Sequence, residues 1–176
     1  KNVVCDLLEM KMADKLKIQA KYSLKENSIL NISKLHDVKN IFERNIVYLK
    51  DEFSEINYVL KTISKESEKY DLTINHQDYN TKSNIINNGV NINTGTLDFN
   101  VTTHVSKGKK NCIVNQNNRI INLTNYPCTI RPVLLIDEVD VIANHSALVG
   151  NFKDEEYFYI ERLGINKNIA SKLLLE

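Results

Sequence analysis

The sequence predicts a mainly β chain that ends in a small helical domain. Short runs rich in Ile, Val, Thr and Tyr recur about every dozen residues, and no helical pattern separates them. Near Asn151 the periodicity changes to a helical one. Strands that follow one another without helices argue against a βαβ fold. On pattern alone a sandwich, a barrel and a coiled β-solenoid all remain open.

The strands begin after a short lead-in at residues 1–13, which reads as one strand or one helical turn. From Asp14 onward apolar residues alternate with polar ones, as expected of a half-buried strand. The apolar positions of this run are Leu16, Ile18, Ala20 and Tyr22. Further strands are predicted at residues 28–32, 45–49, 56–60, 70–74, 85–92, 94–101, 112–114, 119–123 and 133–142.

Two features favour the solenoid among these folds. Two-residue hairpin turns are almost absent, with Asn88-Gly89 as the one candidate. The apolar run Val133–Ile136 suits a strand that is buried on both faces of a stack. A regular solenoid usually has a fixed internal period, however, and this sequence has none that is clear.

Two helices are predicted after the strands. Asn151 or Asp154 can cap the first helix, and Gly164 is a suitable residue to end it. Asn166 can cap a second helix, in which Ile169, Leu173 and Leu174 form an apolar stripe.

Composition narrows the classes of partner. The chain has 176 residues, 42% of them hydrophobic, and 23 Lys and Arg balance 22 Asp and Glu. This balance gives no reason to expect nucleic acid or a membrane surface as a partner, and no apolar run is long enough to span a bilayer. Three widely spaced cysteines (Cys5, Cys112 and Cys128) form no C-x-x-C pair, which favours a reducing compartment over a disulfide framework.

The segment from Arg131 to Glu161 is the most informative part of the sequence. An apolar strand, a histidine among small residues and an acidic, aromatic-rich helix follow one another there. This order resembles the C-terminal pattern of the SufB/SufD family of iron–sulfur cluster assembly proteins. The matching elements are Pro132–Ile136, Asp140-Val141, Ala143–Gly150, Asp154-Glu155, Phe158-Tyr159, Arg162 with Gly164-Ile165, and Ala170–Leu174; Leu163 and Phe152 depart from the pattern. Residues 75–124 resemble the family more loosely.

The resemblance implies a right-handed parallel β-helix core at residues 14–142 and a C-terminal helical domain at 143–176. Within the family, SufB-type members carry Glu after the histidine and Cys after an Asn-Arg pair, where this chain has Ser146 and Ile120. Isoleucine cannot act as a thiolate ligand. The chain therefore looks more like SufD, although a SufB-like or homodimeric cluster scaffold remains an alternative.

The resemblance also implies a non-catalytic scaffold subunit of a cytoplasmic (bacterial) or plastid-type SUF system. It assigns His145 to the junction with a SufB-like subunit, where imidazole is a suitable iron ligand for a transient iron–sulfur cluster, with no tightly bound cofactor. It assigns the C-terminal helices to docking of SufC, an ABC-type ATPase. The expected partner-binding residues are Asp154, Tyr157, Phe158, Tyr159, Ile160, Leu163 and Leu173.

The other histidines and cysteines have structural interpretations. His36 is expected in solvent, His76 and His104 at the surface or in turns, and Cys112 and Cys128 as buried small residues, with sulfur or iron chemistry as the alternative. Two rival functions remain. One is a carbohydrate-active β-helix enzyme, for which Asp137, Glu138 and Asp140 are the only acidic cluster on a strand; the other is a structural β-solenoid without cofactor.

Overall fold

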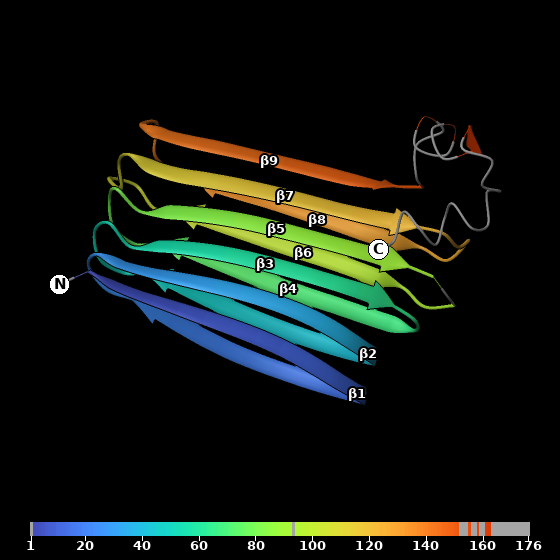
Figure 1. Cartoon of the computed structure of the whole chain (residues 1–176). Coiled ribbons are helices and arrows are strands. Elements are labelled where there is room, and N and C mark those ends of the chain that lie inside the picture. Colours follow the sequence, from blue (N-terminus) through green and yellow to red (C-terminus); the bar gives the residue numbers. More distant parts are fainter. Residues whose placement is uncertain (1, 93, 152–154, 156–157, 159–160, 163–176) are drawn as a thin grey trace.

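A computed structural model describes residues 2–92, 94–151, 155, 158, 161 and 162 of the chain. Its strands coil into a flattened solenoid of two layers, and every strand pairing among these residues is parallel (Figure 1). The prediction of a parallel β-solenoid is confirmed, and hairpin-linked folds are excluded. The strands are β1 (Val3–Leu24), β2 (Ser28–Leu49), β3 (Glu55–Ser64), β4 (Ser67–His76), β5 (Lys82–Asn91), β6 (Leu97–Val105), β7 (Cys112–Asn122), β8 (Cys128–Ile136) and β9 (Val141–Gly150).

The two layers are joined through the long strands at the start of the chain. Residues 29–36 of β2 pair with β3, and residues 40–49 pair with β4. The first layer therefore holds the first halves of β1 and β2, then β3, β5, β7 and β9, and the second layer holds their second halves, then β4, β6 and β8. One passage through both layers is called a coil below.

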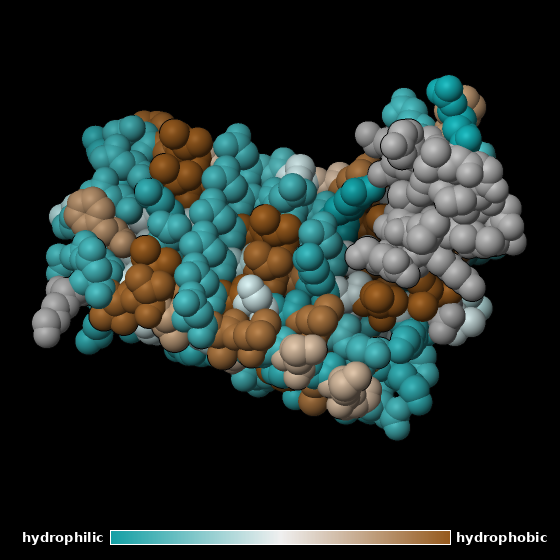
Figure 2. Space-filling view, viewed as in Figure 1, coloured by the Kyte–Doolittle hydropathy of each residue, from teal (hydrophilic) through white to brown (hydrophobic). Residues whose placement is uncertain are grey.

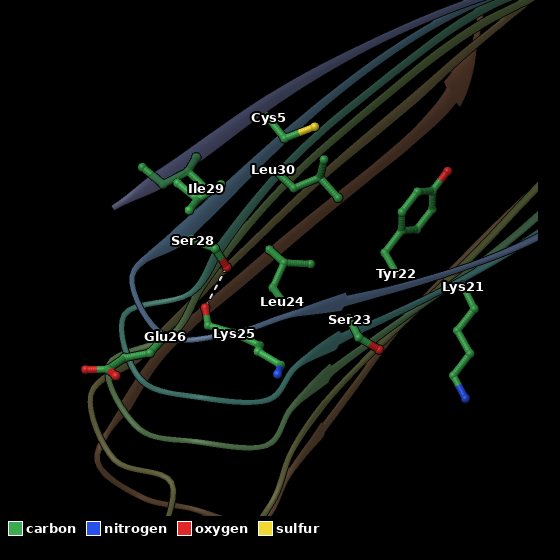
Figure 3. Close-up of a pocket in the computed structure, with 11 residues that line it drawn as sticks. Cys5, Lys21, Tyr22, Ser23, Leu24, Lys25, Glu26, Ser28, Ile29 and Leu30 are labelled. Atoms are coloured by element: carbon green, nitrogen blue, oxygen red, sulfur yellow. Dashed lines mark hydrogen bonds between the residues drawn. The ribbon is translucent and has the colours of Figure 1, made fainter. Parts of the chain in front are cut away.

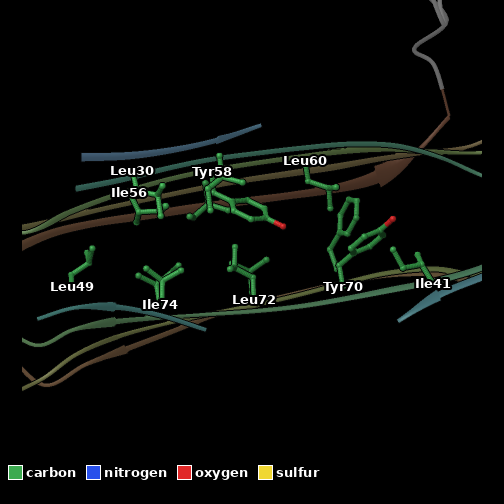
Figure 4. Packing of buried hydrophobic residues seen from close by; sticks show 14 of the residues in the cluster. Leu30, Ile41, Leu49, Ile56, Tyr58, Leu60, Tyr70, Leu72 and Ile74 are labelled. Carbon is green, nitrogen blue, oxygen red and sulfur yellow. The ribbon is translucent and has the colours of Figure 1, made fainter. Parts of the chain in front are cut away.

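The core lies between the layers because alternate residues of each strand point inward. Leu30, Ile56, Tyr58 and Leu60 of the first layer face Leu49, Ile74, Leu72 and Tyr70 of the second (Figure 4). Each fully buried Leu or Ile contributes roughly 1.5–3 kcal/mol relative to an exposed position. This burial holds together strands that share no hairpins.

One turn design recurs where the chain returns from the second layer to the first. A residue with positive φ ends each of four turns and precedes a small side chain that donates to the backbone carbonyl three residues earlier. The positive-φ residues are Asn27, Phe53, Asn80 and Asn111. The donors are Ser28 (2.5 Å to Lys25 O), Ser54 (2.7 Å to Asp51 O), Thr81 (3.0 Å to Asp78 O) and Cys112 (3.2 Å to Lys109 O).

The outer face of the first layer carries a ladder of asparagine side chains. Each amide donates to the residue one coil earlier, and the series ends on the carboxylate of Asp6. Its members are Asn31 (2.7 Å to Asp6), Asn57 (2.9 Å), Asn84 (2.9 Å), Asn115 (3.0 Å) and Asn144 (3.3 Å). Polar and apolar columns that cross the strands alternate on the face shown in Figure 2. The ladder gives these five asparagines a structural role.

The strand boundaries correct several predictions. Residues 3–13 of the expected lead-in are a strand, one of the two forms predicted, but they are continuous with the next strand as the first half of β1. Residues 143–150, assigned to the helical domain, form most of β9. Asn88-Gly89 is no hairpin turn but lies inside β5, where a Cβ on Gly89 would come within 2.4 Å of Leu97 Cδ2. Val133–Ile136 is not buried on both faces, because Val133 and Leu135 point to solvent from β8.

The coils differ in length, which explains why the sequence has no clear period. Register partners are 25 residues apart between β1 and β2 (Val3 with Ser28), 27 between β3 and β5 (Glu55 with Lys82) and 31 between β5 and β7 (Lys82 with Ile113). In the part of the chain that the structure describes, no helix is long and apolar enough to cross a membrane.

Candidate functional site

The candidate site is the end of the solenoid formed by β8 and β9, called the open end below. These strands terminate the sheet order, and within the described residues each has a strand neighbour on one side only. On the second layer the inward-facing residues Ile130, Pro132, Leu134 and Ile136 are only half-buried. The interior of the solenoid is therefore partly uncovered here.

His145 lies in the middle of β9 and belongs to the interior face. Its register partner on β7 is Gln116, which is 3% exposed, and paired residues of parallel strands project to the same side. His145 itself is exposed. Its chain neighbours point the other way: Asn144 donates to Asn115, and Ser146 Oγ donates to Asn117 Oδ1 at 3.0 Å. The imidazole thus lies exposed on the interior face at the open end of the solenoid.

Small residues leave space around this imidazole. Ala143 and Ala147 are the next inward positions on β9, paired with Val114 and Asn118 of β7. His145 is consequently the only inward-facing residue between Val141 and Val149 whose side chain can bind a metal. Among the described residues no group of three or more His, Cys, Asp or Glu side chains is arranged to hold a metal ion. His145 can supply one ligand, and a complete site needs others from elsewhere.

Neutral polar side chains lie beneath the open end. Gln116 Nε2 donates to Thr103 Oγ1 at 2.8 Å across the interior, and Asn87 Nδ2 donates to Asn118 Oδ1 at 2.7 Å. All four residues are buried. This group was missed in the sequence, because amide side chains in strands are usually assigned to solvent-facing positions.

The cysteines are placed differently from one another. Cys112 is fully buried, as predicted, and its thiol takes the place that a hydroxyl occupies in the three earlier turns. Cys128 is half-buried near the second-layer edge of the core, and Asn91 Nδ2 donates to its Sγ at 3.3 Å. Burial raises the pKa of the Cys128 thiol, although hydrogen bonds to Leu97 and Asn91 oppose that shift. For Cys128 this environment favours the neutral thiol of a structural residue.

A buried charged cluster, missed in the sequence, lies in the first coils. Lys34, His36, Glu43 and Glu68 are each at most 2% exposed. Lys34 Nζ forms an ion pair with Glu43 and lies 3.4 Å from Glu9 of β1. Leu30, Ile32 and Val38 occupy alternate positions of β2 and point inward. The same alternation places Lys34 and His36 inward, so the sequence pattern could have predicted their burial.

A tyrosine hydroxyl connects the two sides of the charged cluster. Tyr70 OH lies 3.2 Å from His36 Nδ1 and donates to Glu68 Oε2 at 2.9 Å, which Thr62 Oγ1 also approaches at 2.6 Å. Burial raises the pKa of Glu68 to about 7 despite these two hydrogen bonds. Burial also lowers the pKa of His36, which favours the neutral ring.

Two of the histidine predictions were wrong. His36 is 1% exposed rather than solvated, and His76 is fully buried rather than on the surface. His76 is held by two hydroxyls, with Nδ1 2.7 Å from Thr81 Oγ1 and Nε2 2.9 Å from Ser83 Oγ, and burial lowers its pKa to about 4. His104 is partly exposed, as expected, and lies 3.3 Å from Asp137.

The predicted acidic cluster and one apolar cleft are further surface features of the described residues. Asp137 pairs with His104, and the Glu138 carboxylate accepts the backbone N–H groups of Gly108 and Val139, so this acidic group is engaged in turn structure. A cleft of about 470 Å³ lies where β1 turns into β2, and Cys5, Tyr22, Leu24 and Leu30 line it (Figure 3). Its lining is mostly apolar.

Most of the predicted partner-binding residues lie outside the described residues, namely Asp154, Tyr157, Tyr159, Ile160, Leu163 and Leu173. Phe158 is described, with 63% of its surface exposed and the Arg162 guanidinium 5.8 Å from its ring centroid. Arg162 N also donates to Phe158 O at 3.0 Å, a helical spacing. The C-terminal helical domain as a whole stays a prediction.

Comparison with known proteins identifies the family of this parallel β-solenoid. The family model described as "SUF system FeS cluster assembly, SufBD core domain" matches residues 17–176. This match spans nearly the whole chain, and the chain therefore belongs to the SufB/SufD family. The resemblance that the sequence around His145 indicated is confirmed.

Within the family the chain is similar to a SufD. It is 25% identical over 130 residues to a protein of Bacillus subtilis (strain 168) described as "Iron-sulfur cluster assembly protein SufD". The aligned part covers 73% of this chain but 30% of the relative. The chain thus spans about a third of the length of that relative.

Proposed function

We propose that this chain is a non-catalytic scaffold subunit of the SUF system, which meets a SufB-like subunit at its open end and docks SufC through its C-terminal helices. The observation that carries the proposal is the place of His145. It is an uncovered imidazole on the interior face of the last strand, in a chain of the SufB/SufD family.

The geometry of the open end supports a protein partner. Unpaired strand edges and half-buried apolar side chains are features that proteins normally cover. A partner that extends the sheets beyond β8 and β9 would bury Ile130, Pro132 and Leu134 and would close the interior over His145. Among the described residues, strand edges without a neighbour and half-buried apolar side chains therefore fit a protein subunit better than a small ligand.

The chemistry of the end supports a shared cluster site. Iron in an iron–sulfur cluster is usually held by thiolates, with imidazole as an alternative ligand. His145 offers one ligand, while Ser146 and Ile120 replace the groups that SufB-type members carry. A nascent cluster, as the cargo of assembly, would take its remaining ligands from the SufB-like subunit.

The SufC interaction rests on the family resemblance and on Phe158. An exposed aromatic side chain beside Arg162 suits a protein contact, since aromatic and Arg residues are enriched at interfaces. ATP hydrolysis would belong to SufC, and this chain alone would hydrolyse nothing.

The test is co-expression of the chain with a SufB-like protein and SufC, followed by measurement of cluster content under anaerobic conditions. His145→Ala should lower the cluster yield at least tenfold while the complex still co-purifies. Asn144→Ala is the matched control, since Asn144 adjoins His145 but faces outward. Equal yields from the wild type and His145→Ala would refute the cluster role.

The docking part needs a separate variant. Phe158→Ser should reduce co-purification of SufC and leave the SufB-like subunit bound, whereas Phe53→Ser, at an exposed turn of the solenoid, should change neither. Retention of SufC by chains with a polar 157–163 face would remove this part of the proposal. Polysaccharide turnover by the purified chain would instead support the carbohydrate-active alternative.

A further inference from the structure

The inward-facing residues in register with His145 form a row across the strands. One side chain of this row can orient the imidazole. In this row Ile85 of β5, Gln116 of β7 and His145 of β9 are successive register partners. Strands of a sheet lie about 4.8 Å apart, so side chains in successive positions are in contact range. Ile85 has no hydrogen-bonding side chain, and Gln116 therefore is the polar group next to His145.

The carboxamide of Gln116 donates one hydrogen bond, whereas its oxygen lacks a donor. Its Nε2 donates to Thr103 Oγ1 at 2.8 Å, which fixes the direction of the carboxamide. Its Oε1 is buried and has no hydrogen-bond partner within the described part of the chain. A buried carbonyl without a donor costs about 1–3 kcal/mol. An N–H group that reaches this oxygen would remove that penalty.

The described residues that adjoin His145 on β9 cannot perform this role. Asn144 and Ser146 face outward and are bonded to Asn115 and Asn117. Ala143 and Ala147, its inward neighbours on β9, carry no polar atoms in their side chains. His145 is the register partner of Gln116 on β9, so its imidazole is the donor-bearing side chain next to the unpaired oxygen in this row of residues.

We propose that Gln116 is a positioning residue for His145: its Oε1 accepts the N–H of one imidazole nitrogen and leaves the other nitrogen free to bind iron. The metal-binding half of this statement rests on the proposed function, whereas the hydrogen bond does not. Ligating histidines generally donate their second ring N–H to an oxygen acceptor, which fixes the tautomer and the ring plane. Thr103 acts one step further away, because it holds the carboxamide in place.

The hydrogen bond is tested by ¹⁵N–¹H NMR of the histidine side chains in the whole isolated chain at pH 8. The wild type should show one dominant His145 tautomer, a ring N–H that exchanges slowly with solvent, and a nuclear Overhauser contact between this proton and the Gln116 side chain. Gln116→Met keeps the size of the side chain but removes the acceptor, and it should mix the tautomers and speed the exchange. Gln116→Glu keeps an acceptor oxygen and should restore a single tautomer. Asn117→Ala, on the outer face, should match the wild type.

The consequence for the cluster is measured in the co-expressed complex. Loss of an outer ligand of this kind typically weakens metal binding or activity 10- to 100-fold. Gln116→Met should therefore lower the cluster yield about tenfold, and Gln116→Glu should recover most of it. A normal yield from Gln116→Met would overturn the positioning role.

The two proposals fail in different ways. If His145→Ala leaves the cluster yield unchanged but the NMR signature is present, the proposed function fails and the hydrogen bond stands. A wild-type ring N–H that exchanges freely, with a tautomer ratio like that of free histidine, would overturn the inference. This result needs no variant, so the test holds even if Gln116→Met does not fold.

Discussion

The first and last coils of this solenoid bury different kinds of polar side chain in the interior. In the first coils the ion pair of Lys34 and Glu43 lies buried between the layers. In the last coils the interior is neutral, with Gln116 and Thr103 hydrogen-bonded across the gap. A buried charge is tolerated only when it is paired, whereas an amide can be left partly unpaired at a modest cost. The neutral last coils can therefore keep the Gln116 carbonyl oxygen without a donor next to His145.

The largest expected effect comes from unpairing the charged cluster. Lys34→Met leaves the Glu43 carboxylate buried without its cation, and such changes usually cost about 3–5 kcal/mol. The double variant Lys34→Met/Glu43→Leu should recover most of that loss. Urea denaturation gives the free energies of unfolding, with Lys61→Met on the exposed face of β3 as control. A loss no greater than that of the control would show that the cluster is hydrated.

The next effect is the pH dependence of the free energy of unfolding that Glu68 causes. Because its folded pKa of about 7 exceeds the ordinary value of 4.5, the folded state holds this proton more tightly than the unfolded state does. Its contribution to stability is therefore full below pH 4.5 and is lost as the pH rises to 7, a loss of about 3 kcal/mol. Relative to the wild type, Glu68→Gln should gain about that much between pH 4.5 and 8. A difference that does not vary with pH would contradict the raised pKa.

A smaller loss is expected from the matching change in the neutral coils. Asn87→Leu leaves Asn118 Oδ1 without its donor, which should cost about 1–3 kcal/mol in the free energy of unfolding. The comparison between the two ends predicts that this loss stays below that of Lys34→Met. If the order were reversed, charge would not be what distinguishes the two interiors.

The smallest effect concerns the buried thiol. Cys112→Ser keeps a donor for Lys109 O, as serine does in the first two turns, and should change the free energy of unfolding by less than about 1 kcal/mol. Cluster yield in the complex should be unchanged. A folded Cys112→Ser chain that no longer yields clusters would give the thiol a chemical role.

Local patterns in the sequence predicted the strands and the family, but not what fills the interior. Alternation located the strands, and the residues around His145 identified the family. The pairing of strands one coil apart depends on contacts between distant residues, and coils of unequal length conceal it. The charged cluster was missed because His36 was assigned to solvent by residue type rather than by its place in the alternation of β2. The extent of β9 was missed because small residues around His145 resemble a loop.

The central claim is that a partner subunit covers the open end of the solenoid. Hydrogen–deuterium exchange of the chain, free and bound to a SufB-like protein, tests this claim most directly, because edge amides exchange slowly once a strand pairs with them. We predict slower exchange in β9 and β8, with β1 at the other end unchanged. Slower exchange confined to β1, or no change at either end, would contradict the account.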